Sequence, residues 1–171
     1  QGHFLERSGL DFEDFAVGQH FVHRPGVTVS QQDNVMESLD TLNAAMLHYD
    51  HHYAAQTSWK HPLMVSTITL QNLIGMSSKT FARRARIERF ASIAMTAPVF
   101  GGDTIYAESE VLATRPGSDA ATGIITLRLI LMALATPSFS ETAFVSRPQA
   151  RRRAAKSAAF APPRSIGTRT P

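Results

Sequence analysis

Hydrophobic residues recur along this chain first at helical spacing and later at strand spacing. Residues 30–42 repeat them every three or four positions, and Ser30 followed by Asp33 is typical of a helix N-terminus. Residues 66–78 are hydrophobic on nearly every side, which favours a buried helix. Because Gly75 has low helix propensity, its place inside this second helix indicates close packing against a neighbour.

Strand-like segments lie on both sides of these helices. An early one covers residues 20–30, although Pro25 and Gly26 interrupt it. Four later ones are separated by turns that contain proline, glycine and serine. They cover residues 87–98, 104–114, 122–135 and 141–147. A hydrophobic helix followed by an antiparallel meander predicts an α+β fold, a single domain whose antiparallel sheet wraps around a central buried helix.

The composition is compatible with one such domain. The chain has 171 residues, of which 43% are hydrophobic, enough for a core of useful size. No stretch approaches the run of about 18 hydrophobic residues that a membrane-spanning helix needs, and the N-terminus lacks the hydrophobic segment of a signal peptide. The absence of cysteine excludes disulfides and cysteine nucleophiles. We therefore expect a cytoplasmic protein without a membrane partner.

Positive charge is concentrated at the C-terminal end. Six basic and no acidic residues follow position 149, which leaves 11 basic and 14 acidic residues in the rest of the chain. This end is rich in alanine, proline, arginine and serine and has no hydrophobic period, so it cannot bury enough surface to fold alone. A solvated end explains it better than a nucleic-acid-binding arm. We expect a flexible segment at 1–9, a folded domain at 10–148 and a disordered basic tail at 149–171.

A histidine and an aspartate two residues apart form the most informative local feature. They are His48 and Asp50, in the stretch L-N-A-A-M-L-H-Y-D-H-H-Y-A-A of residues 42–55. This spacing delivers an acid/base pair on a turn that follows the first helix. Asp50 can equally cap a short helix that is expected to begin at His51. No metal site is predicted here, because adjacent histidines point apart and the H-E-x-x-H pattern is missing.

Four stretches, in this order, resemble the MaoC-like acyl dehydratases, hot-dog-fold hydratases that act on coenzyme A thioesters. F-E-D-F-A-V-G-Q at 12–19 is similar to the family's opening motif, and L-H-Y-D-H-H-Y-A-A at 47–55 to its hydratase signature. The stretch from Pro62 into the second helix resembles the hot-dog helix. A-P-V-F-G-G-D-T-I-Y-A-E-S-E-V at 97–111 resembles the family's strand pair, in which Asp103 is expected to shape a turn.

The resemblance implies roles for three residues around the signature. The family's usual motif is D-x-N-P-L-H-x-D, and its first aspartate aligns with Asn43 when the histidine aligns with His48. An amide cannot transfer a proton at neutral pH. In a branch resembling mesaconyl-CoA hydratases and β-methylmalyl-CoA dehydratases, Asn43 would orient a water while His48 and Asp50 carry protons. From the residues alone, Asn43 can also be no more than the C-cap of the first helix.

Substrate contacts are expected at both ends of the second helix. Val65, Ser66 and Thr67 would bind the thioester at its N-terminus, where unpaired N–H groups can meet an enolate. Ser66 can instead be the N-cap of that helix. Arg83 and Arg84 would meet the phosphates of coenzyme A, although a solvated charged loop explains them as easily.

The implied activity is reversible hydration of an enoyl-CoA, or dehydration of a 3-hydroxyacyl-CoA, with a branched or dicarboxylic C4–C5 acyl group. Coenzyme A would be part of the substrate, and no separate cofactor is expected. Two alternatives remain open at this level: a hot-dog thioesterase and a non-catalytic acyl-thioester-binding subunit. The resemblance also implies a homodimer or pairing with a second hot-dog unit, and no nucleic acid as a partner.

Overall fold

The structure, a computed structural model, describes residues 8–118, 122–133 and 142–148, and the backbone alone within 142–148. The expected basic tail at 149–171 and most of the expected flexible segment at 1–9 lie outside these residues. None of the helices in the described part of the chain has the length and hydrophobic character that a membrane-spanning segment needs.

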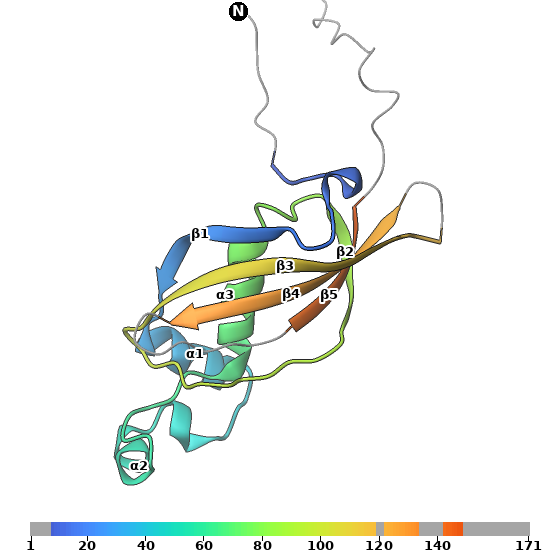
Figure 1. The fold of residues 1–171 in the computed structure, drawn as a ribbon. Helices are drawn as coiled ribbons and strands as arrows, with labels where there is room; N and C mark the ends of the chain where they lie inside the picture. The colour runs from blue at the N-terminus through green and yellow to red at the C-terminus, as the bar shows by residue number, and fades with distance from the viewer. Residues whose placement is uncertain (1–7, 119–121, 134–141, 149–171) are drawn as a thin grey trace, which may run out of the picture.

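One antiparallel sheet wraps around one long helix, as predicted (Figure 1). The sheet has five strands in the order β1-β3-β4-β5-β2. They are β1 (His20–Thr28), β2 (Arg84–Phe90), β3 (Thr104–Pro116), β4 (Gly123–Ala133) and β5 (Thr142–Pro148). The helices are α1 (Gln31–Asp40), α2 (His51–Gln56) and α3 (Ser66–Ser77), with 3-10 turns η1 (Phe12–Asp14) and η2 (Met46–His48). The α+β prediction is confirmed.

The predicted four-strand meander is correct for its last three strands and wrong for its first. β3, β4 and β5 are neighbours in sequence and in the sheet, whereas β2 pairs with β5 at the far edge rather than with β3. The predicted strand at 87–98 begins earlier, at Arg84, and ends at Phe90, and residues 91–98 form no regular element. A hydrophobic pattern indicates that a segment is extended, but it says nothing about which strand it pairs with.

The helix α3 is buried on one face only. Leu73 is 1% exposed and packs with the inward side chains of β3 and β4, whose buried residues alternate along each strand. The prediction of burial nearly all round is wrong, because Ser66, Thr67, Gln71 and Gly75 are exposed. Close packing at Gly75 is also wrong, since a Cβ built there meets no atom within 4 Å.

The opening motif at 12–19 closes the C-terminal end of α3. The Phe15 ring stacks on the Phe81 ring with 5.6 Å between centroids. A Cβ at Gly123 of β4 would lie 2.1 Å from the ring of Phe12, so only glycine leaves room for that ring. The backbone N–H of Leu10 donates to the carbonyl of Thr80 at 3.0 Å. The residues of this motif therefore contribute to the hydrophobic core.

Candidate active site

His48 is held by a backbone carbonyl that the sequence did not reveal. The imidazole lies at the end of η2, half-buried, and its Nδ1 is 2.8 Å from the carbonyl oxygen of Leu63. Because a carbonyl oxygen can only accept, Nδ1 carries the hydrogen in the neutral imidazole. Nε2 then keeps its lone pair. Nε2 is thus the basic nitrogen of the ring, and the group that fixes this tautomer is the Leu63 carbonyl.

The segment that contains Leu63 leads directly into α3. Leu63 also donates its N–H to the carbonyl of Leu47 at 3.2 Å and pairs with Phe100. Met64 N–H donates to the carbonyl of Val99 at 2.8 Å. These bonds join the histidine turn, the start of α3 and the loop before β3. Only Met64 and Val65 separate Leu63 from Ser66, the first residue of α3, so Leu63 and Ser66 lie within about 11 Å of each other.

The N-terminus of α3 is open. Its N-cap is Val65, so the alternative in which Ser66 is the N-cap is wrong. Ser66 and Thr67 occupy the first turn and are exposed. Among the described residues, no side chain hydrogen-bonds to the amides of this turn. The first turn thus offers unpaired N–H donors and the positive end of the helix dipole beside His48.

Asn34 is a buried residue of α1 that joins these parts, and sequence reasoning gave it no role in the site. Its Nδ2 donates to the carbonyls of His48 (2.7 Å) and Leu63 (3.0 Å), and its Oδ1 accepts from the N–H of Val65 at 2.8 Å. The hydrophobic period gave no signal for it, because Asn34 lies on the opposite side of α1 from Met36 and Leu39, which are 53% and 57% exposed.

Asn43 takes part in the turn that ends α1. Its N–H donates to the carbonyl of Ser38 at 2.8 Å, while Leu42, at φ 55°, donates to Leu39 at 3.1 Å. This pair of bonds is a Schellman motif. The side-chain oxygen of Asn43 accepts from the N–H of Ala45 at 3.0 Å. Thr41 is the C-cap, so Asn43 is not the C-cap that the sequence suggested but the second residue after it, and a role in orienting water stays a prediction.

Asp50 is the N-cap of α2. Its Oδ1 accepts from the N–H of Tyr53 at 2.9 Å, in the manner of an N-capping aspartate. The capping interpretation is confirmed, and proton transfer by Asp50 stays a prediction.

A pair of variants separates the two roles of Asp50. Asparagine caps helices as well as aspartate does but cannot carry a proton, whereas alanine does neither. We expect Asp50→Asn to keep the free energy of unfolding and Asp50→Ala to lower it by about 1 kcal/mol. Chemical denaturation measures both. Hydratase turnover that survives in Asp50→Asn would show that the carboxylate only caps α2, and a large loss would make it part of the chemistry.

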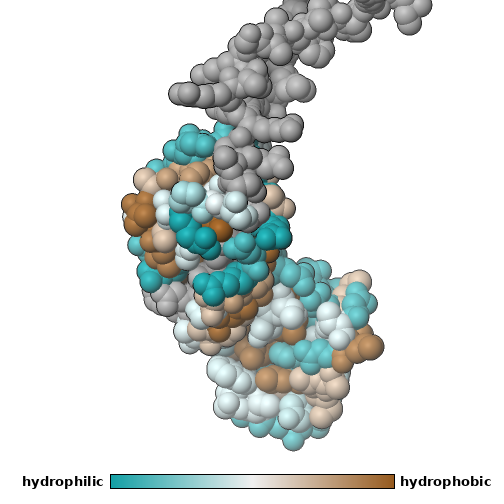
Figure 2. Space-filling model, turned by 90° about the vertical axis from the view of Figure 1, so that its right-hand side faces the viewer, coloured by the Kyte–Doolittle hydropathy of each residue, from teal (hydrophilic) through white to brown (hydrophobic). Residues whose placement is uncertain are grey.

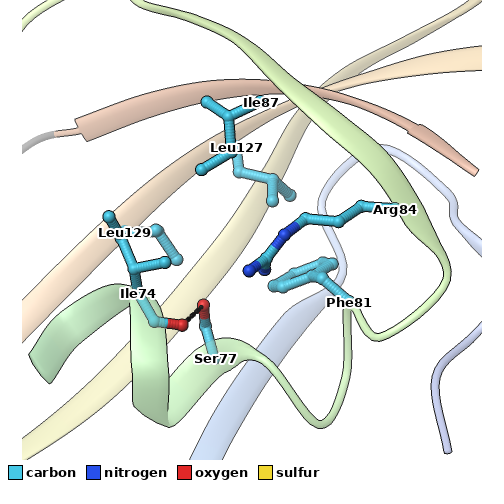
Figure 3. Close-up of a pocket in the computed structure, with 7 residues that line it drawn as sticks. All are labelled: Ile74, Ser77, Phe81, Arg84, Ile87, Leu127 and Leu129. Carbon is cyan, nitrogen blue, oxygen red and sulfur yellow. Dashed lines mark hydrogen bonds between the residues drawn. The ribbon is translucent and has the colours of Figure 1, made fainter. Parts of the chain in front are cut away.

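Arg83 and Arg84 lie at the other end of α3 from His48. Since α3 has 12 residues, its ends are about 18 Å apart. Arg83 forms an ion pair with Asp11. Arg84 points into a small cavity of about 10 Å³ between the last turn of α3 and the sheet, otherwise lined by Ile74, Ser77, Phe81, Ile87, Leu127 and Leu129 (Figure 3). The described chain does not bring either arginine to His48, and their contact with coenzyme A stays a prediction.

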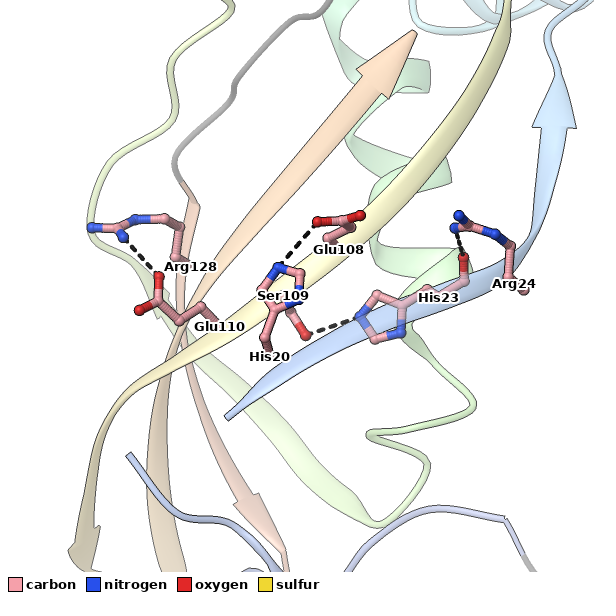
Figure 4. Close-up of polar contacts among 7 residues, drawn as sticks. All are labelled: His20, His23, Arg24, Glu108, Ser109, Glu110 and Arg128. Carbon is pink, nitrogen blue, oxygen red and sulfur yellow. Dashed lines mark hydrogen bonds and ion pairs between the residues drawn. The ribbon is translucent and has the colours of Figure 1, made fainter. Parts of the chain in front are cut away.

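Among the histidines that the structure describes, the buried one is His23, on β1. It is 4% exposed, its Nε2 lies 2.9 Å from Oγ of Ser109, and its Nδ1 lies 3.3 Å from Oγ1 of Thr80. Figure 4 shows it beside the ion pair of His20 with Glu108. Burial lowers the pKa of His23 below the usual 6.5; the nearby Glu108 carboxylate opposes this, while His20 and Arg24 add to it. His23 is a core residue that stays neutral.

This lowered pKa predicts acid sensitivity of the fold. Below pH 6.5 the unfolded chain binds a proton at His23 that the folded chain refuses, so stability falls with pH until the folded pKa is reached. Each pH unit within that window costs the wild type about 1.4 kcal/mol relative to a variant without this group. Urea denaturation between about pH 7.5 and pH 5 should show a smaller loss for His23→Gln. Equal losses in both proteins would contradict the prediction.

A five-stranded antiparallel sheet wrapped around one helix defines a hot-dog domain, and the segment that holds the imidazole of His48 leads into the N-terminus of that helix. The chain belongs to the family described as MaoC like domain, whose profile matches residues 12–132. It is 29% identical over 126 residues to mesaconyl-CoA hydratase of Cereibacter sphaeroides, a match that covers 74% of this chain and 36% of the relative. It is 28% identical over 111 residues to β-methylmalyl-CoA dehydratase of Chloroflexus aurantiacus, covering 64% and 32%.

Solved structures share the fold. A MaoC domain protein from Chloroflexus aurantiacus superposes with a TM-score of 0.79 at 20% identity, over 84% of this chain and 46% of that one. A Mycobacterium tuberculosis protein described as a double hot-dog fold gives a TM-score of 0.77 at 23% identity, over 85% and 46%. The chain thus spans about a third of the length of the curated relatives and about half of these structures. The expected single hot-dog domain is confirmed.

Proposed function

We propose that this chain carries the site of a hydro-lyase that hydrates an enoyl-CoA thioester and, in reverse, dehydrates the 3-hydroxyacyl-CoA. One observation carries the proposal. The 2.8 Å hydrogen bond from Nδ1 of His48 to the Leu63 carbonyl turns the imidazole into an Nε2 base beside the open N-terminus of α3. Both parts that thioester hydration needs, a base and a set of enolate-stabilising donors, then lie together.

The chemistry can run through His48 alone. In dehydration, Nε2 takes the proton from carbon 2 of the 3-hydroxyacyl thioester, and the electron pair moves onto the thioester carbonyl. The enolate collapses to the double bond as the hydroxyl on carbon 3 leaves with the proton returned by the imidazolium. Water is released and His48 is neutral again. A positioned imidazole contributes roughly 10²–10⁴-fold to such a step.

The amides of Ser66 and Thr67 are the donors that we assign to the enolate oxygen. They lie in the first turn of a 12-residue helix, where the dipole favours negative charge. Backbone donors held by a helix need no rearrangement as charge develops on the thioester. Val65 contributes less directly to stabilisation of the enolate, because its N–H already donates to Oδ1 of Asn34.

The acyl group that we propose is a branched or dicarboxylic C4–C5 unit, with coenzyme A as part of the substrate. The support is the similarity to two relatives named for mesaconyl-CoA and β-methylmalyl-CoA chemistry, together with Asn43 at the family's aspartate position. The amide group of Asn43 would orient the water that adds to carbon 3, since its oxygen already serves the turn.

A second hot-dog unit, from another copy or another chain, would complete the site. The exposed hydrophobic side chains of α1, α2 and the segments next to them are Met36, Leu39, Leu42, Met46, Tyr53 and Trp59. Figure 2 shows hydrophobic surface in the lower half of the molecule, the half that holds α1 and α2 in Figure 1. Leu42 is 89% exposed, and burial of its side chain by a partner would add hydrophobic stabilisation.

The test is the enoyl-thioester absorbance after the purified chain is added to mesaconyl-CoA and, separately, to crotonyl-CoA. Loss of absorbance, without release of free coenzyme A, is the expected result, and the faster substrate identifies the acyl class. Free coenzyme A would indicate a thioesterase instead. Binding of the thioester without either change would make the chain a non-catalytic acyl-thioester binder and would overturn the proposal. Size-exclusion chromatography with light scattering, run in parallel, reports whether the active species is a dimer.

A further inference from the structure

Asn34 is a polar side chain in a position that packing alone would give to a hydrophobic residue. It lies on α1 with 0% of its surface exposed. A buried carboxamide destabilises a fold unless its hydrogen bonds are satisfied, and those of Asn34 are satisfied almost entirely by backbone groups of other segments. Asn34 therefore does more than fill a buried position, because its side chain connects segments that are distant in sequence.

The amide nitrogen of Asn34 bonds to the histidine segment, and its amide oxygen bonds to the start of α3. Nδ2 donates to the carbonyl of Leu63, and that carbonyl also accepts from Nδ1 of His48, so both of its lone pairs are in use. Nδ2 also donates to the carbonyl of His48 itself at 2.7 Å. Oδ1 accepts from the N–H of Val65, the N-cap of α3. One side chain thus connects the imidazole, the acceptor that fixes its tautomer, and the helix that offers the donors.

A second layer of contacts holds Asn34 in place. Gln31, one helical turn earlier, donates from Nε2 to the carbonyl of His48 at 2.9 Å and accepts from Nδ2 of Asn34 at 3.3 Å. Gly101 packs on Gln31 so closely that a Cβ there would lie 2.7 Å from the Cβ of Gln31. The first turn of α1 therefore packs between the turn before β3 and the histidine segment.

We infer that Asn34 is a positioning residue, which holds the imidazole of His48 in the Nδ1–H tautomer and at a fixed distance from the N-terminus of α3. It touches no substrate. This inference rests on the proposed function for its kinetic consequence, but its structural consequence at His48 can be measured without any substrate. A misplacement of about 1 Å at a reacting group can cost about 100-fold in rate, so removal of Asn34 should act on turnover.

The kinetic test compares three variants. Asn34→Leu replaces the carboxamide by a hydrophobic group of similar shape, and Asn34→Asp keeps an acceptor for Val65 but loses the amide donors. Ser38→Ala is the matched control, because Ser38 is also 0% exposed on α1 and its hydroxyl donates only to the carbonyl of Asn34 at 2.7 Å. We expect both Asn34 variants to lower kcat about 100-fold with little change in KM, and Ser38→Ala to stay within a few-fold of wild type.

The second measurement is the tautomer of His48 by ¹⁵N NMR of protein labelled at its seven histidines, with the His48 signals assigned by their loss in His48→Gln. The wild type should show Nδ1 protonated in the neutral imidazole, and both Asn34 variants should shift toward the other tautomer. An unchanged tautomer in a folded Asn34 variant overturns the inference. So does a kcat loss in Ser38→Ala equal to that of the Asn34 variants.

The two ideas can fail separately. If the wild type hydrates no thioester, the proposed function fails, whereas the tautomer shift in the Asn34 variants still supports the positioning role. If the wild type is active and the Asn34 variants keep both kcat and the Nδ1–H tautomer, the positioning role fails alone. Should Asn34→Leu not fold, Asn34→Asp provides both readouts.

Discussion

Replacement of His48 by glutamine is expected to lower kcat for thioester hydration at least about 100-fold, with little change in KM. Glutamine can still donate to the Leu63 carbonyl, so the turn should hold, but it offers no basic nitrogen at neutral pH. The loss falls on turnover because Nε2 acts on the proton that moves in the reaction. Enoyl-thioester absorbance under steady-state conditions measures kcat and KM separately.

His52→Gln is the matched control for this experiment. It makes the same change four residues later, on an exposed position of α2. We expect it to keep wild-type kcat and the same free energy of unfolding. A His48→Gln variant that remains as active as His52→Gln would remove His48 from the mechanism. If His48→Gln also lost thioester binding, His48 would have to hold the substrate as well.

The largest expected effect on stability comes from Leu73→Ala. Leu73 is 1% exposed on the face of α3 that packs against the sheet, where its removal leaves a cavity. Such truncations of buried leucine cost about 3 kcal/mol, from lost hydrophobic transfer and from the unfilled volume. Because α3 also carries the donors assigned to the enolate, partial loosening of this helix would lower hydratase activity before the protein unfolds.

Urea denaturation of Leu73→Ala measures this cost directly. Leu39→Ala is the control, since Leu39 is 57% exposed on α1 and its truncation should change the free energy of unfolding by less than about 0.5 kcal/mol. Similar losses in the two variants would mean that Leu39 is covered by a partner in solution. In that case the unfolding midpoint of Leu39→Ala would depend on protein concentration, as expected for a dimer.

Local sequence features were sufficient for the elements and for the identity of the candidate base. Ser30 accepts from Gln32 and Asp33 as a helix N-cap should, and Asp50 caps α2, because capping depends on residues within one turn. The hydrophobic period located α3 within one residue of its observed end, and Pro25 with Gly26 marked the irregularity inside β1. These interactions are local, and local interactions can be recognised from spacing along the chain.

Hydrogen-bond partners that are distant in sequence could be identified only from the tertiary structure. The sequence predicted His48 and Asp50 as an acid/base pair, but it could not show that Nδ1 of His48 bonds to the Leu63 carbonyl, 15 residues away. Backbone carbonyls have no residue-specific signature, so no spacing rule can find them. Asn34 was overlooked for the same reason, since its meaning depends on three backbone groups that only folding brings to it.

The sequence by itself therefore determined the family, the α+β class, the helix at the centre of the sheet and the histidine. The tertiary structure decided that β2 crosses to the far edge beside β5, that α3 is open at its N-terminus, and that Arg83 and Arg84 lie at its other end. The physical reason is that hydrophobic period and capping are properties of one segment. Strand order, tautomer and the distance between two groups are properties of segments brought together by folding.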